Sequence, residues 1–174
     1  GTHAITVNNV APTVALTGAD TVDEGSVYPL SVGAITDPGV DTVTSYIINW
    51  GDGNSDTLTA AELAGLGGNV THTYADYEDG PVNSTPRNIT VDLVDEDGTH
   101  VAAGSKTVNV NNVAPIIALA GASNVDEDTL YTLTLGAVTD PGTDTVTEYI
   151  VDWGDGTMES YFAAGDVTHI YADP

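Results

Sequence analysis

The chain has 174 residues, of which 26 are acidic and only two are basic, so its formal net charge at pH 7 is −24. This charge repels nucleic acid phosphates and anionic membrane surfaces, which excludes both as partners, and it attracts cations. There is no cysteine, and therefore no disulfide or thiol chemistry. Hydrophobic residues make up 41% of the chain, enough for a core. No apolar run approaches the ~18 residues of a membrane span, so we expect no membrane insertion.

The hexapeptide "VNNVAP" occurs twice, beginning at Val7 and at Val110, an offset of 103 residues. The similarity extends without a gap from Asn8–Gly53 onto Asn111–Gly156. A period of about 100 residues is that of a whole domain rather than of a solenoid unit. We therefore expect the terminal strand of a preceding repeat over residues 1–9, a complete repeat over 10–112 and an incomplete repeat over 113–174.

Alternating apolar and polar residues, separated by turn sequences rich in Asp and Gly, predict about seven short antiparallel strands and hence an all-β sandwich. The strand that contains Pro29 is expected at a sheet edge or at a bulge, because proline cannot donate to a ladder. "TAAELAGL" (Thr59–Leu66) predicts a short helix. The side chains expected on buried strand faces are, in chain order, Tyr28, Leu30, Val32, Tyr46, Ile48, Trp50, Ile89, Val91 and Leu93.

Three motifs together resemble a polycystic kidney disease (PKD) domain. They are "WGDG" at Trp50–Gly53, an "HxY" strand at His72–Tyr74, and a strand of the form "xVxLxVxDxxG" at Thr90–Gly98. The first two recur at Trp153–Gly156 and His169–Tyr171. The resemblance implies an immunoglobulin-like β-sandwich with a non-catalytic, extracellular role.

The wider frame, "VNNVAP" followed by "DEG" and "DPGxDTV", is similar to PKD-like repeats of very long secreted bacterial proteins. Such repeats often have calcium-binding or adhesive roles, so the resemblance implies a secreted or cell-surface location in a bacterium. PKD domains also accompany secreted proteases and polysaccharide hydrolases as spacers or binding modules.

The aspartates of the two "GDG" turns allow two interpretations. Asp52 and Asp155 could accept backbone N–H bonds within the turn, which is the favoured interpretation, or could bind a metal. His72 and His169 are expected to pack and to form hydrogen bonds rather than to bind zinc, because no cysteine and few other histidines accompany them.

Calcium is the cofactor that the acidic loops favour, because it takes six to eight oxygen ligands from carboxylates, amides, backbone and water. In the expected sandwich these loops gather at the upstream end of the complete repeat and at its junction with the next repeat. The scheme is similar to cadherin junctions, although asparagine replaces aspartate in the linker, which implies weaker sites. No segment fits an EF-hand. The candidate ligands are Asn8, Asn9, Asp37, Asp41, Asp95 and Asp97 upstream, and Asp23, Glu24, Asn111, Asn112, Asp140 and Asp144 at the junction.

A second interpretation needs no metal. Asp, Asn and Gly are common in turns for conformational reasons alone, and an acidic surface can be an adaptation to salt.

A structural or adhesive spacer is the favoured function, with neighbouring repeats and a surface protein or polysaccharide as partners. The alternative is a carbohydrate- or protein-binding accessory module, for which Tyr77, Tyr161 and Phe162 are the candidate contact residues. An enzyme is disfavoured, because the paired carboxylates recur with the repeat and one catalytic pair would not.

The incomplete repeat is expected to leave a sheet edge and part of a core uncovered. Residues 1–9 of a neighbouring chain could add there as a strand, or this part of the chain could be poorly ordered.

Overall fold

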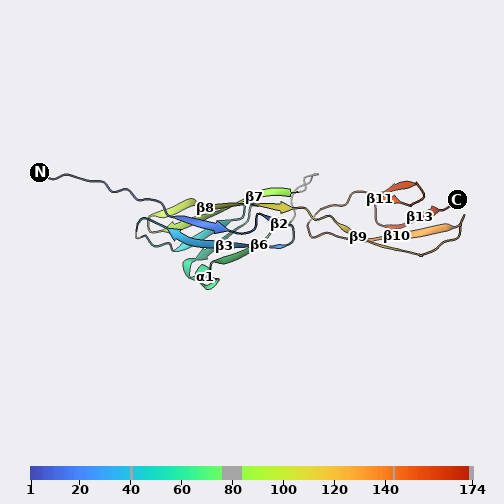
Figure 1. Ribbon diagram of the computed structural model, residues 1–174, viewed down its shortest axis with the longest axis horizontal. Coiled ribbons are helices and arrows are strands. Elements are labelled where there is room, and N and C mark those ends of the chain that lie inside the picture. Colours follow the sequence, from blue (N-terminus) through green and yellow to red (C-terminus); the bar gives the residue numbers. More distant parts are fainter. Residues whose placement is uncertain (40, 76–83, 143, 173–174) are drawn as a thin grey trace. The chain divides into compact units, whose positions relative to one another are not determined.

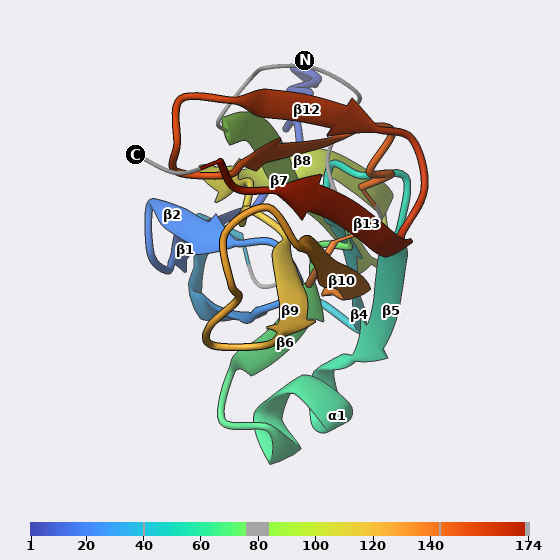
Figure 2. The ribbon, with the colours of Figure 1, turned by 90° about the vertical axis from the view of Figure 1, so that its right-hand side faces the viewer.

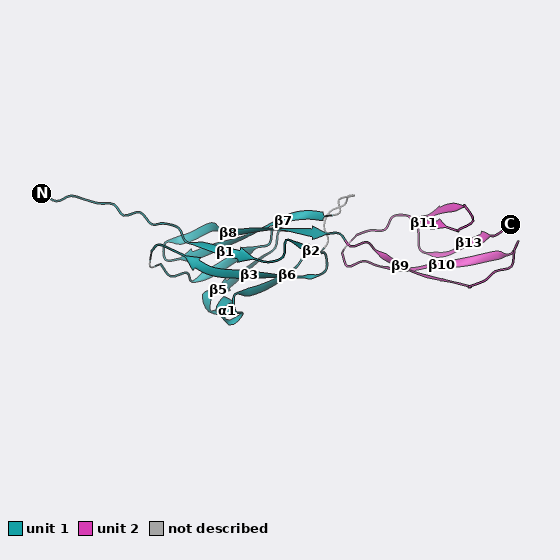
Figure 3. Cartoon of the chain, in the orientation of Figure 1, with its two compact units in different colours: residues 1–112 teal, residues 113–174 magenta. Residues whose placement is uncertain are grey.

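Strands make up most of the regular structure in both parts of the chain (Figure 1). The computed structural model describes residues 1–39, 41–75, 84–142 and 144–172. The chain divides into unit 1, Gly1–Asn112, and unit 2, Val113–Pro174 (Figure 3). The expectation of an all-β protein is therefore confirmed.

Unit 1 contains two sheets. One has the order β1-β3-β6 and the other the order β2-β8-β7-β4-β5. Every neighbouring pair is antiparallel except β2 with β8, which is parallel. The strands are β1 (Thr13–Thr17), β2 (Thr21–Asp23), β3 (Val27–Thr36), β4 (Ser45–Asn49), β5 (Ser55–Thr59), β6 (Asn69–Thr73), β7 (Ser84–Asp95) and β8 (Gly98–Asn111).

The two sheets of unit 1 share one core, to which the alternating positions of the sequence contribute. Tyr28 and Leu30 of β3 and Ile48 of β4 are each 0% exposed, and Trp50 directly after β4 is equally buried. All nine residues expected on buried faces belong to this core. Period-two patterning identified these faces correctly, because a half-buried strand must turn every second side chain inward.

The expectation for Pro29 was wrong in part, because β3 is the central strand of its sheet. The β1–β3 ladder ends at the pair Thr17–Ser31, before Pro29 is reached. Val32 N donates to Gly68 O on the β6 side, so the nitrogen of Pro29, three residues earlier, points to the opposite side. There the ladder has already ended, and the missing N–H therefore breaks no ladder hydrogen bond.

The predicted helix is present as α1 (Ala60–Gly65), which connects β5 to β6 (Figure 2). Thr59 is its N-cap, and Glu62 completes a capping box by accepting from Thr59 N while Glu62 N donates to Thr59 Oγ1. Leu63 anchors the helix in the core. Among the described residues no helix combines the length and apolar character needed to cross a membrane.

Unit 2 contains a three-stranded antiparallel sheet of order β13-β10-β9 and a two-stranded sheet of β11 and β12. Its buried core is small and consists of Leu135, Val151, Trp153 and Val167. The strands are β9 (Ile116–Gly121), β10 (Leu130–Thr139), β11 (Tyr149–Asp152), β12 (Met158–Tyr161) and β13 (Gly165–Ile170).

Replacing Val91 by alanine should destabilise unit 1 by about 2 kcal/mol, because the side chain is 0% exposed and its loss leaves a cavity between the sheets. Val101→Ala is the matched control, since Val101 is 76% exposed and the change should stay within about 0.5 kcal/mol. Urea unfolding followed by circular dichroism measures both changes. Equal losses would contradict the assigned core.

Candidate metal-binding loops

The carboxylate of Asp52 is used by the turn that follows β4. Asp52 Oδ1 accepts from Asn54 N at 2.9 Å, and Oδ2 forms a 2.7 Å hydrogen bond with His72 Nε2 on β6. The His72 ring stacks on Trp50, with ring centroids 4.7 Å apart and an interplanar angle of 9°. Burial acts to raise the pKa of Asp52, but the hydrogen bonds from His72 and Asn54 outweigh burial and lower the pKa below its ordinary value. This geometry fits the turn interpretation rather than metal binding.

The same arrangement recurs in unit 2. Asp155 Oδ1 accepts from Thr157 N and Oγ1, and Oδ2 bonds to His169 Nε2 at 2.7 Å. His169 stacks on Trp153. The hydrogen bonds from Thr157, with a further one from His169, lower the pKa of Asp155 to about 2. The two histidines therefore pack and bond as expected.

Asp37 and Asp41 lie in the loop between β3 and β4. Asp37 Oδ1 accepts from Gly39 N at 2.8 Å. The Oδ2 atoms of Asp37 and Asp41 are buried and accept no hydrogen bond from any residue that the structure describes. A Cβ on Gly39 would lie 3.1 Å from Asp41 Oδ2 and 3.3 Å from Asp37 Oδ1, so the two carboxylates flank this glycine. Buried carboxylate oxygens without a donor are costly unless a proton or a cation meets them.

Burial raises the pKa of Asp41, and the carboxylates of Asp37, Asp97, Glu96 and Asp95 raise it further. A carboxyl with a raised pKa in the folded state favours folding while it is protonated, and this stabilisation is lost as the pH rises through that pKa. At neutral pH the loop therefore holds repelling charge, which a bound cation would relieve.

Asp95 belongs to the turn between β7 and β8, but its oxygens are already engaged. The side chain is fully buried, Oδ1 accepts from Asp97 N and Gly98 N, and Oδ2 bonds to His100 Nε2 at 2.7 Å. Burial acts to raise the pKa of Asp95. The hydrogen bonds outweigh burial, so the pKa of Asp95 lies below its ordinary value. Asp95 therefore shapes the turn, and Asp97 remains the candidate ligand of this turn.

Glu96 joins the two acidic loops of unit 1 and was not among the sequence-based candidates. Its Oε2 accepts from Thr42 N at 2.9 Å, so the β7–β8 turn is tied to the β3–β4 loop. The acidic run "DEDG" was the signal that could have identified it. The structure thus brings Asp37, Glu96 and Asp97 together around Asp41, and the charge of each raises the pKa of Asp41.

Asn8 and Asn9, the other upstream candidates, lie in the extended segment that precedes β1. Both are exposed and outside any strand. The structure describes no hydrogen bond between them and the acidic loops, so their role as ligands stays a prediction.

At the other end of unit 1, the structure brings Asp23 and Glu24 together with Asn111. Asp23 Oδ1 accepts from Asn111 Nδ2 at 3.0 Å, and Glu24 N donates to Asn111 O at 3.0 Å. The parallel pairing of β2 with β8 aligns Asp23 with Asn111. Glu24 is only 1% exposed, whereas Asn112 is exposed. Since Asn111 donates through its amide nitrogen, its amide oxygen points away from Asp23.

In unit 2, Asp140 repeats the geometry of Asp37. Its Oδ1 accepts from Gly142 N at 2.7 Å, as Asp37 Oδ1 does from Gly39 N. Asp144 is half-buried in the same loop between β10 and β11. The loop therefore presents carboxylates at the positions that correspond to Asp37 and Asp41.

Two of the three aromatic candidates for a binding platform, Tyr161 and Phe162, lie in the described part of the chain. Tyr161 packs against the core of unit 2 and donates to Glu159 Oε2, whereas Phe162 is 79% exposed. Tyr77 lies outside the described residues.

A scan of the chain against protein-family models and a search of curated proteins both find no match.

Replacing Thr157 by alanine should raise the pKa of Asp155 from about 2 toward the ordinary value, because the Thr157 side chain is the largest cause of the low pKa. A depressed carboxyl pKa stabilises the fold above about pH 4 and loses that effect as the pH falls toward 2. A carboxyl-carbon NMR titration of the folded chain measures the pKa. Thr147→Ala, an exposed threonine outside this turn, is the control. An unchanged pKa in Thr157→Ala would contradict the assignment.

Proposed function

We propose that the chain is a non-catalytic structural or adhesive module of a secreted or cell-surface bacterial protein, built from tandem immunoglobulin-like, PKD-like β-sandwich repeats and stiffened by calcium. The observation that carries the calcium proposal is the pair of buried Oδ2 atoms of Asp37 and Asp41, which meet no donor among the described residues and lie beside further acidic groups. A divalent cation satisfies such oxygens without the protonation that neutral pH opposes.

The ligands proposed for the upstream site are Asp37, Asp41 and Asp97, with the remaining positions taken by backbone carbonyl groups, by water and by Asn8 or Asn9. Glu96 acts there as a tether, because its Oε2 holds Thr42 N and so keeps the two loops in register. Hard oxygen ligands of this kind suit calcium better than zinc, which prefers nitrogen and sulfur.

A second calcium site is proposed for the junction of consecutive repeats, formed by Asp23, Glu24, Asn111 and Asn112 together with Asp140 and Asp144. Two features support this proposal. Asp140 and Asp144 follow Asp37 and Asp41 at the 103-residue offset, and the "NN" linker lies between the two sets in the sequence. Within unit 1, the hydrogen bond from Asn111 to Asp23 joins the last residue of β8, just before the junction, to the last residue of β2.

The structural role is supported by the nature of the polar groups. Paired aspartate and histidine side chains can act in catalysis in enzymes. In this chain the histidine of each pair stacks on a core tryptophan, and the arrangement recurs in both units. The aspartate carboxylates of these pairs accept hydrogen bonds from backbone N–H groups of their own turns. This favours a role in stabilising the turns rather than in catalysis.

Calcium added to the metal-stripped chain should raise the unfolding midpoint at pH 7, with a Kd of about 10⁻⁴–10⁻³ M and about 2.7 kcal/mol of stabilisation at 100-fold excess over Kd. The effect should fade as the pH falls through the raised pKa of Asp41, because protons then compete with calcium for this carboxylate. Thermal unfolding followed by circular dichroism, together with titration calorimetry, measures both. A midpoint that stays constant up to millimolar calcium would leave turn chemistry as the whole explanation of the acidic loops.

The matched pair for this experiment is Asp41→Asn and Glu62→Gln, which change the net charge by the same amount. Asp41→Asn should weaken calcium binding at the upstream site at least about tenfold. Glu62→Gln keeps the capping box and lies outside the group of charges that act on Asp41, so binding should not change. Equal weakening in both variants would indicate a general charge effect rather than a site.

Calcium should also narrow the distribution of distances between the two units, because a shared ion restrains the linker. The chain has no cysteine, so Thr57→Cys and Thr168→Cys, both exposed, allow clean spin labelling for pulsed electron spin resonance. Asp140→Asn should abolish the narrowing. A distribution that is equally broad with and without calcium would refute the junction site and leave the upstream site untouched.

A further inference from the structure

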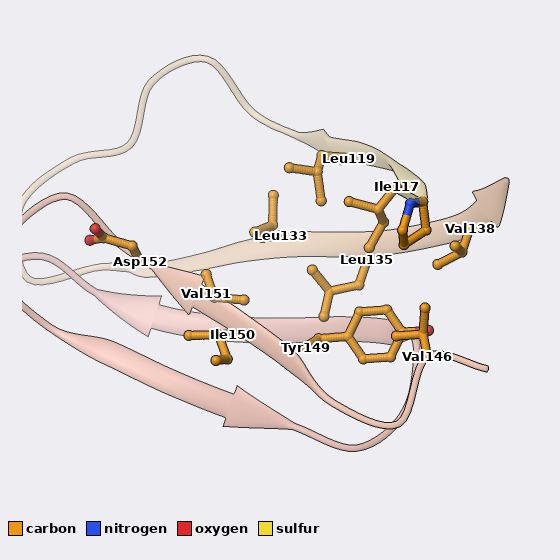
Figure 4. Close-up of a pocket in the computed structure, with 11 residues that line it drawn as sticks. Ile117, Leu119, Leu133, Leu135, Val138, Val146, Tyr149, Ile150, Val151 and Asp152 are labelled. Carbon is orange, nitrogen blue, oxygen red and sulfur yellow. The ribbon is translucent and has the colours of Figure 1, made fainter. Parts of the chain in front are cut away.

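An apolar groove of about 320 Å³ opens in unit 2 between β9 and β10 on one side and β11 on the other (Figure 4). Ile117 and Leu119 of β9, Leu133 of β10 and Val151 of β11 contribute to its lining. Leu119 is 59% exposed, although it belongs to this apolar set. Core-type side chains therefore line a surface that the described part of unit 2 does not cover.

One edge of β11 is also unpaired among the described residues. β11 pairs with β12 on its other side, and these two strands form a sheet by themselves. In unit 1 the corresponding strand β4 lies between β5 and β7, with Tyr46 opposite Leu93 and Ile48 opposite Val91. An open edge next to an apolar groove is a template for strand addition.

Unit 1 shows what covers the equivalent surface there. At the 103-residue offset, Ile117 and Leu119 correspond to Val14 and Leu16. A Cβ on Gly104 of β8 would lie 2.8 Å from Val14 Cγ1 and 3.2 Å from Leu16 Cγ, so β8 passes directly over these two side chains. The hairpin of β7 and β8 thus closes the groove of unit 1 with its own strands.

The glycine after each tryptophan gives an independent indication. Gly51 and Gly154 share a φ of +81°. A Cβ on Gly51 would lie 2.7 Å from Asn88 O and 2.9 Å from Asn88 N, because the β7 backbone presses against the turn. A Cβ on Gly154 would meet no described atom within 4 Å. The space beside Gly154 is therefore open, whereas the backbone of β7 fills the equivalent space beside Gly51 in unit 1.

We propose that the groove of unit 2 is a docking site for a β-hairpin of the type formed by Ser84–Asn111. Its first strand pairs antiparallel with the free edge of β11, and its second strand covers Ile117 and Leu119. The chemistry required is an Ile, Val or Leu at alternate positions of the first strand, as in Ile89, Val91 and Leu93, and a small residue where the second strand crosses β9. The hairpin holds the chain's two basic residues but also four acidic ones, so strand pairing and the apolar lining, rather than net charge, favour this occupant.

A single donated strand fits the groove less well. Residues 1–9 resemble the end of β8, since Ile5 and Val7 correspond to Val108 and Val110, which are 0% and 1% exposed. In unit 1, however, β8 pairs with β7 and β2 rather than with β4. A strand of the β8 type by itself would leave the edge of β11 open.

A synthetic peptide of residues 84–111, added to the full chain, tests the proposal. We expect 1:1 binding and a slowing of hydrogen exchange at the amides of Tyr149–Asp152 by at least about tenfold. Peptide carrying Val91→Asp and Leu93→Asp should not bind. No slowing at about 1 mM peptide, or protection confined to other strands, would overturn the proposal. A peptide of residues 1–12 that protects β11 equally well would overturn it in favour of strand donation.

Two chain variants distinguish binding in the groove from non-specific hydrophobic binding of the peptide. Leu119→Asp should abolish peptide binding, whereas Ile170→Asp, at a similarly exposed apolar position of unit 2 outside the groove lining, should not. Because the free peptide could associate with itself, the same sequence is also fused after Pro174 through residues 76–83. The fused chain should show the same protection of β11, which Leu119→Asp should remove. Fusion without protection would overturn the proposal.

Discussion

The cluster around each tryptophan is the interaction on which the rest of the structure depends. Trp50 directly follows β4 of one sheet, and His72 belongs to β6 of the other, so their stacking joins the two layers of unit 1. Asp52 bonds to His72, Tyr74 donates to Trp50 O, and Trp50 donates through Nε1 to Asp56. A few polar bonds thus hold the aromatic centre of the core in one orientation.

The acidic loops of unit 1 lie at the other end of β4, where the β3–β4 loop meets the β7–β8 turn. The acidic loops are ordered by bonds from backbone N–H groups to Asp37, Glu96 and Asp95. Ordering concentrates carboxylates that would repel one another in a chain with a net charge of −24. A divalent cation that binds between such carboxylates relieves their mutual repulsion. For this reason we favour calcium binding over surface acidity alone as the explanation of these loops.

Unit 2 builds the same aromatic centre with fewer strands. Trp153, His169 and Tyr171 repeat the stacking and edge contacts of their counterparts, and Tyr171 donates to Trp153 O. The buried cluster nevertheless contains only Leu135, Val151, Trp153 and Val167, because no described strand covers β9 and the free edge of β11. The local turn and the global core are therefore separable: the first needs only short-range hydrogen bonds, and the second needs a complete set of strands.

The sequence by itself determined the strand faces, the helix with its capping box and the positions of the acidic turns, because alternation, capping and turn chemistry act over a few residues. The tertiary structure alone decided which carboxylates are available. Asp95 and Asp37 look alike in the sequence. Both oxygens of Asp95 nevertheless form hydrogen bonds, within its own turn and to His100, whereas one buried oxygen of Asp37 meets no donor in the part of the chain that the structure describes. Similarly, Pro29 is tolerated in a central strand only because the β1 ladder ends before it. Pairing between segments distant along the chain sets these outcomes, and local sequence patterns do not report it.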